Sequence, residues 1–156
     1  MAELIKLDKF VDSRGWSVND VYLEVRKRIR HHNTPYYDEV ISPLSYQINY
    51  SHINPGIVKA WHRHKNQDDY FFVVHGMAQV GVYSKKNGPE KFFIGEHNPA
   101  LVHIHAGEWH GLTPLGTEPC GLLYYVTNEY DPKRPDEERA PWNDFVGSGW
   151  WNPEFK

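Results

Sequence analysis

Residues 56–76, which read GIVKAWHRHKNQDDYFFVVHG, decide the fold of this chain. His62 and His64 lie two positions apart, so on an extended strand both side chains project from the same face. A short polar turn and Asp69 follow, and Tyr70–Val74 then forms an apolar strand that ends near a glycine. A hairpin of this kind can bring one carboxylate opposite the two imidazoles. That combination can either bind a divalent metal or transfer protons.

Length and composition limit the class of protein. The chain has 156 residues, enough for one domain with a core of its own, and a formal charge of -3 that gives no basic surface for nucleic acid. A single cysteine, Cys120, excludes an internal disulfide. No signal peptide and no apolar run of membrane-spanning length are found. We therefore expect a cytoplasmic protein that binds neither nucleic acid nor membrane.

Short strands separated by Gly, Pro and Asn turns recur along the chain, whereas no long helical period is present. This spacing is typical of an all-β sandwich or barrel. Beyond the central hairpin, the expected strands are 4–10, 44–51, 78–83, 91–94, 101–105 and 121–127.

Two further stretches carry polar groups that a cavity could use. In the strand 44–51, Gln47 and Asn49 share one face and Ile48 the other, so the amide face either lines a pocket or meets solvent. Farther along, His105 and His110 flank a glycine turn. This turn can return His110 towards the cavity that holds His62 and His64.

The C-terminal residues are polar and Pro-punctuated from Asp131 to Arg139 and then aromatic, with Trp142, Trp150 and Trp151. Such aromatic area is seldom left in water. The tail is therefore expected to pack on the domain or on a second subunit. We predict a single domain, 1–156, with N-terminal strands in 1–51, a core in 52–130 and an aromatic tail in 131–156.

The central stretch resembles the first motif of the cupins. Gly56, five residues, His62-x-His64, four residues, Asp69, six residues and Gly76 match it, with Asp in place of the usual Glu. His105-x-Gly107-x-x-His110 is similar to the core of the second motif. The resemblance implies a jelly roll, or double-stranded β-helix, with short peripheral helices or loops. It says little about the reaction.

A narrower resemblance covers nearly the whole chain, since five segments in order look like the dTDP-4-dehydrorhamnose 3,5-epimerase family. These are the turn at 12–15, Gln47-x-Asn49-x-Ser51, residues 56–62, residues 124–132 and Trp142-Asn143-Asp144. The family implies a nucleotide-linked 4-keto-6-deoxy sugar as substrate. It also implies a homodimer, often with exchanged N-terminal strands.

The resemblance assigns roles to single residues. His62 falls on the general base, and Tyr124 falls on the opposing acid. Lys59 takes the place of a phosphate-binding arginine, which keeps the charge but loses the bidentate geometry. Pocket positions of the family that contact substrate fall on Arg14, Gln47, Asn49 and His110, and we place His64 with them.

Two departures from the family concern the residues that would assist His62 and Tyr124 in catalysis. The lysine that would stabilise the enolate aligns with Asp69, and the aspartate that orients the base belongs to a C-terminal extension without a counterpart up to Lys156. Asp69 is thus expected to act in catalysis by orienting a histidine. As an alternative, His62, His64, Asp69 and His110 form the three-histidine, one-carboxylate set of metal cupins.

The sequence therefore predicts an isomerase, a sugar epimerase that needs no cofactor, and leaves a divalent metal open. It would abstract a proton at C3 or C5, next to the C4 ketone, and return one on the other face. The alternatives are a 3,4-ketoisomerase on the same substrate class, a metal-dependent cupin enzyme, and a sugar-binding cupin without catalysis.

Overall fold

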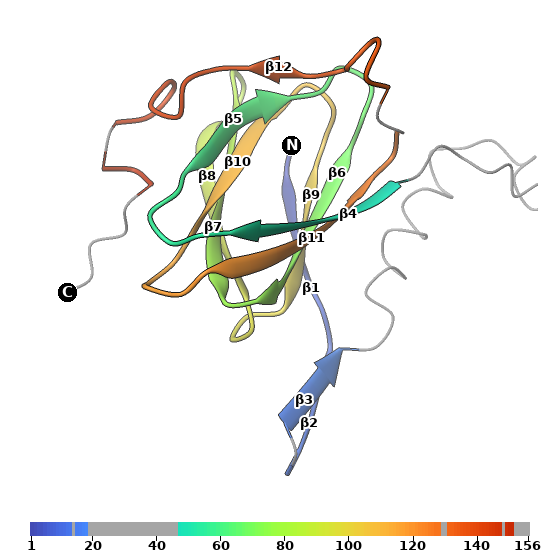
Figure 1. Cartoon of the computed structure of the whole chain (residues 1–156), viewed down its shortest axis with the longest axis vertical. Helices are drawn as coiled ribbons and strands as arrows, with labels where there is room; N and C mark the ends of the chain where they lie inside the picture. Colours follow the sequence, from blue (N-terminus) through green and yellow to red (C-terminus); the bar gives the residue numbers. More distant parts are fainter. Residues whose placement is uncertain (14, 19–46, 129–130, 148, 152–156) are drawn as a thin grey trace, which may run out of the picture.

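The computed structural model describes residues 1–13, 15–18, 47–128, 131–147 and 149–151. Two five-stranded antiparallel sheets face each other (Figure 1). The described residues contain strands, turns and loops only, so the all-β class is confirmed for them. Among them, no helix is long and apolar enough to cross a membrane.

The first sheet has the order β1-β9-β6-β11-β4, and all its neighbours are antiparallel. Its strands are β1 (Glu3–Lys6), β9 (Ala100–Ile104), β6 (Asp69–His75), β11 (Cys120–Val126) and β4 (Gln47–Ile53).

The second sheet has the order β12-β5-β10-β7-β8. Its strands are β12 (Glu138–Arg139), β5 (Lys59–Arg63), β10 (Trp109–Pro114), β7 (Met77–Ser84) and β8 (Gly88–Gly95). A separate hairpin pairs β2 (Lys9–Asp12) with β3 (Gly15–Val18) and lies away from the two sheets (Figure 1). The single strand expected over 4–10 is therefore two strands.

The core fills the space between the sheets. Alternation along β6 turns Phe71 and Val73 inward, where they meet Val80 and Val82 of β7 and Leu112 of β10. A second, smaller cluster of Ile5, Tyr70 and Leu101 covers the outer face of the first sheet. Apolar residues on the inner faces of both sheets thus build the core, and the polar residues of the site interrupt these faces at one end.

The aromatic tail packs on the outer face of the second sheet, which confirms contact with the chain's own body. Trp151 is fully buried, and its ring centroid lies 4.8 Å from that of Trp61. Phe145 stacks on Tyr83 at 4.4 Å. Because Trp61 points to this face, its neighbour His62 points to the other, between the sheets.

Candidate active site

β5, the residue after it, and β10 bring His62, His64 and His110 together. His62 and His110 are direct partners in the antiparallel register, and their ring centroids lie 4.3 Å apart. The strands approach closely because Gly111 has no side chain: a Cβ there would lie 2.3 Å from the Cβ of Ala60. His64 follows two positions after His62, and its ring lies 5.5 Å from that of His110. The sequence prediction that His110 returns to His62 and His64 is confirmed in position.

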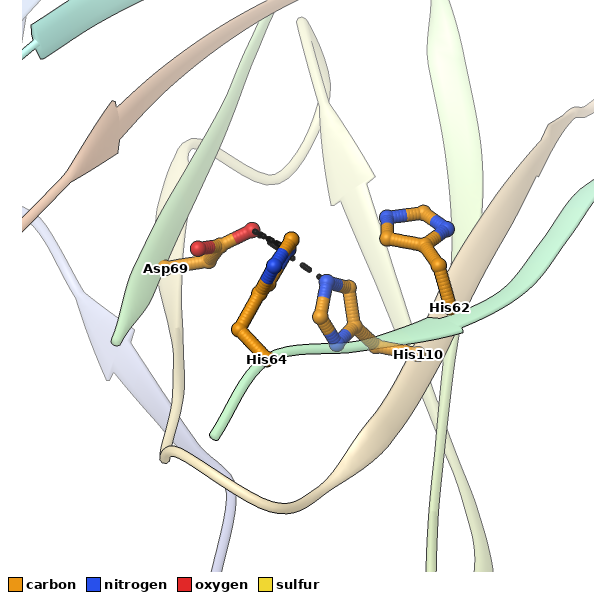
Figure 2. Close-up of side chains that lie close together, drawn as sticks. All are labelled: His62, His64, Asp69 and His110. Carbon is orange, nitrogen blue, oxygen red and sulfur yellow. Dashed lines mark hydrogen bonds and ion pairs between the residues drawn. The ribbon is translucent and has the colours of Figure 1, made fainter. Parts of the chain in front are cut away.

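Asp69 reaches the same place from the opposite sheet. It is the first residue of β6 and is 2 % exposed. Its Oδ1 accepts a hydrogen bond of 2.6 Å from the Gln67 amide. Its Oδ2 lies 3.2 Å from Nε2 of His110 and 3.7 Å from Nε2 of His64 (Figure 2). The ligand atoms of His62, His64, Asp69 and His110 all lie within 4.8 Å of one another.

Backbone carbonyls fix how His64 and His110 present their nitrogens. Nδ1 of His110 lies 3.0 Å from the Glu108 carbonyl oxygen, and Nδ1 of His64 lies 2.5 Å from that of Asp136. A carbonyl can only accept, so each Nδ1 carries the proton. In the neutral rings both Nε2 lone pairs then face the Asp69 carboxylate. Either a proton or a cation must lie between these groups to make the arrangement favourable.

His62 is held in its neutral form. Burial lowers the pKa of His62 well below the ordinary value, and the charges of His110, His64, Lys59 and Arg139 lower it further. No hydrogen bond to its ring is found within the described ranges. A partly buried imidazole with a lowered pKa and no fixed hydrogen-bond partner has the properties of a general base near neutral pH.

Tyr124 lies across the cavity on β11, between Asn49 of β4 and Phe71 of β6 in the register. The cavity measures about 800 Å³ and is lined by both sheets. Tyr124 and His62 line it from opposite sheets. Gln47 and Asn49 also line it, joined by a hydrogen bond of 2.7 Å, so the amide face of β4 meets the cavity and not solvent.

The remaining predicted site residues do not all line the cavity. Lys59 and His64 line the cavity, whereas His110 is 1 % exposed and lies behind them, in contact with Asp69. Arg14 lies outside the described residues.

Sequence reasoning missed the segment 131–140, which forms one wall of the cavity. It contributes Asp131, Arg134, Asp136, Glu137 and Arg139 to the lining. Burial raises the pKa of the Asp136 carboxyl, but backbone N–H groups of Lys65 and Asn66 outweigh it, so the net direction is downward. Only the polar, Pro-punctuated composition of this segment signalled a loop, and nothing in it pointed to the histidines.

A second histidine cluster lies on the outer face of the first sheet. Asp68 Oδ2 accepts a hydrogen bond of 2.8 Å from Nε2 of His103 and lies 3.6 Å from Nδ1 of His105. Nδ1 of His103 is buried without a partner. Binding of a metal through Nε2 would place a proton on that orphaned Nδ1, which is costly. This cluster therefore fits a structural hydrogen bond from Nε2 of His103 to the Asp68 carboxylate better than a metal site.

The two facing sheets and the histidine-lined cavity define a cupin jelly roll, as the motif spacing predicted. Residues 36–138 match the family model described as the polysaccharide biosynthesis C-terminal domain. This chain belongs to that family.

Two relatives extend the comparison. The spore coat polysaccharide biosynthesis protein SpsL of Bacillus subtilis is 40 % identical over 116 residues, which cover 70 % of this chain and 77 % of that protein. The probable low-salt glycan biosynthesis epimerase Agl13 of Haloferax volcanii is 41 % identical over 124 residues, 75 % of this chain and 78 % of its own.

Solved structures agree in fold. NovW of Streptomyces spheroides, a 4-keto-6-deoxy sugar epimerase, aligns with a TM-score of 0.75 at 20 % identity, over 97 % of this chain and 75 % of its own. The dTDP-4-dehydrorhamnose 3,5-epimerase of Elizabethkingia anophelis aligns with a TM-score of 0.72 at 19 % identity, over 98 % of this chain and 82 % of its own. The expected likeness to the dTDP-4-dehydrorhamnose 3,5-epimerase family is thus confirmed for the fold.

Proposed function

We propose that this chain is a nucleotide-sugar epimerase that acts on a dTDP-4-keto-6-deoxyhexose or a closely related substrate. The observation that carries the proposal is the pair of His62 and Tyr124, which line one cavity from opposite sheets. The low pKa of His62 leaves it free to accept a proton at neutral pH. The naming of one relative as a probable glycan epimerase supports the same reaction class.

The reaction removes one proton from one face of the sugar and adds one proton on the opposite face. His62 takes the proton from C3 or C5, which is acidic because the electron pair left behind delocalises onto the C4 ketone oxygen. The Tyr124 hydroxyl gives a proton to the same carbon from the opposite side, and the carbon is inverted. The enolate oxygen needs a donor or a cation near it. Lys59 is one candidate, since it lines the cavity and forms no ion pair with a described residue.

Proton exchange tests this proposal directly. In deuterated water, dTDP-4-keto-6-deoxyglucose is expected to gain deuterium at C3 or C5. His62→Asn should slow this exchange by about 10²- to 10⁴-fold, the usual contribution of a general base. Tyr124→Phe should keep part of the exchange on the His62 face while inversion fails. Unchanged turnover in His62→Asn would remove His62 as the base.

A second candidate is a metal-dependent cupin enzyme, and a specific observation favours it. His64 and His110 direct their Nε2 atoms at Asp69 with each Nδ1–H bound to a carbonyl, which is the outer hydrogen bonding typical of metal-ligating histidines. His62, His64, Asp69 and His110 would hold the cation. When bound, such a cation would polarise a substrate oxygen as a Lewis acid.

Elemental analysis of protein purified without added metal separates the candidates. Substrate exchange without stoichiometric metal supports the epimerase. One equivalent of iron, manganese, nickel or zinc without exchange supports the metal enzyme, because a metal-bound His62 is no base. A 3,4-ketoisomerase would exchange protons and move the ketone, and a binding cupin would do neither.

The proposal includes a homodimer in the cytoplasm. Ile48, Tyr50 and Val74 lie on the outer face of the first sheet and are 57 %, 58 % and 42 % exposed, an apolar area that suits a second copy. The single, buried thiol of Cys120 suits a reducing compartment.

A further inference from the structure

The second half of the segment 131–140 is joined to the edge of β5 and to the turn that follows it. Trp61 and Ala140 exchange two backbone hydrogen bonds of 3.0 and 2.9 Å. The guanidinium of Arg63 donates to one oxygen of Glu138 at 3.0 and 2.7 Å. β12 pairs with β5 so that Arg139 faces His62. This attachment places residue 136 beside His64.

Asp136 contacts the His64 region with both its backbone and its side chain. Its two carboxylate oxygens accept the backbone N–H groups of Lys65 and Asn66 at 2.9 and 2.7 Å. Its carbonyl oxygen accepts from Nδ1 of His64 at 2.5 Å. The carboxylate thus holds the turn that follows His64, and in doing so it brings the carbonyl to the imidazole.

We propose that Asp136 is a positioning residue of the active site, which sets the tautomer and orientation of His64. With Nδ1 protonated by this contact, Nε2 of His64 is the atom that faces Asp69 and the cavity. Asp136 itself acts only through His64. The role in turnover rests on the proposed epimerase function, whereas the role in setting the tautomer does not.

Nitrogen NMR of histidine-labelled protein tests the tautomer without any substrate. The wild type is expected to show His64, assigned by its loss in His64→Asn, as a single Nδ1–H tautomer. In Asp136→Ala the carboxylate no longer holds the carbonyl in place, so the His64 signals should move to the averaged position of mixed tautomers. Asp144→Asn removes an exposed carboxylate farther along the same tail and should leave the His64 signals unchanged.

Kinetics then test whether this positioning matters. Asp136→Ala should lower kcat of epimerisation by about 10- to 100-fold, as loss of an outer hydrogen-bond partner does, with a smaller change in KM. Should this variant not fold, Asp136→Asn takes its place, because its single amide oxygen keeps one of the two backbone contacts and should give part of both effects. An unchanged His64 spectrum overturns the proposal, and so does a changed spectrum with kcat within twofold of the wild type. If the wild type itself shows no turnover, the proposed function fails while the spectra still decide the role of Asp136.

Discussion

Neighbouring residues with the same chemistry serve different purposes in this protein. Asp68 and Asp69 are adjacent on an extended segment, so their carboxylates point to opposite faces of the first sheet. Asp69 joins His64 and His110 between the sheets, whereas Asp68 pairs with His103 on the outer face. The same alternation separates His62 from Trp61. At this scale, the role of each residue depends on the face of the strand from which its side chain projects.

The lowered pKa of His62 predicts a pH profile. The neutral ring is the active base, so kcat/KM should stay flat as pH falls through 6.5 and decline only at lower pH. Lys59 is one of the charges that lower this pKa, so Lys59→Met should raise it and move the acid limb to higher pH. Lys85→Met, on an exposed turn, is the control and should leave the limb in place. A wild-type limb at or above pH 6.5 contradicts the prediction.

Asp68 predicts a pH-dependent stability. Burial raises the pKa of its carboxyl, but hydrogen bonds from His103, His105 and Ala106 lower it more, so the net direction is well below the usual range. Asp68→Asn should reduce the free energy of unfolding by about 1–3 kcal/mol at neutral pH. The difference is complete above the unfolded pKa of 3.8 and shrinks as pH falls towards the lower folded pKa.

Urea unfolding of the wild type and of Asp68→Asn at neutral pH and at about pH 3 checks this sign. A difference that stays equal or grows in acid would show that the charge of Asp68 is not what stabilises the fold.

At the scale of elements, the packing of the C-terminal tail depends on the absence of a side chain at Gly81 in β7. A Cβ on Gly81 would lie 2.4 Å from Trp151 and 2.7 Å from Trp150, so only glycine leaves room for the two rings. Gly81→Ala should displace the tail and lower the free energy of unfolding by about 1–3 kcal/mol, the usual cost of overpacking.

Thermal unfolding and tryptophan fluorescence measure both effects in Gly81→Ala. Gly147→Ala is the matched control, because a Cβ there meets no atom within 4 Å. If the two variants behave alike, the tail does not depend on contact with β7.

For the whole molecule, the exposed apolar face of the first sheet predicts a dimer. Light scattering after size exclusion should give twice the chain mass for the wild type and one chain mass for Ile48→Lys, because a buried unpaired ammonium opposes association. Phe93→Lys, on the outer face of the second sheet and 44 % exposed, should remain dimeric. A monomeric wild type would contradict the dimer.

Much of the strand pattern could be predicted from local sequence, because alternation and turn residues act over a few positions. The pairing of His62 with His64 on one face and the amide face of Gln47 and Asn49 follow from spacing alone. The split of 4–10 into β1 and β2 did not follow, since the whole stretch is strand-like in composition and only its pairing partners differ.

The sequence by itself determined which residues could form a proton-transfer or metal site, because residue type and strand period are local properties. Only the tertiary structure decided how they act together. It placed His110 behind His62, turned Asp69 inward while Asp68 turned outward, and brought Asp136 to His64 across 72 positions of chain. These choices follow from the register of distant strands and the packing of the tail, which no short stretch of sequence encodes.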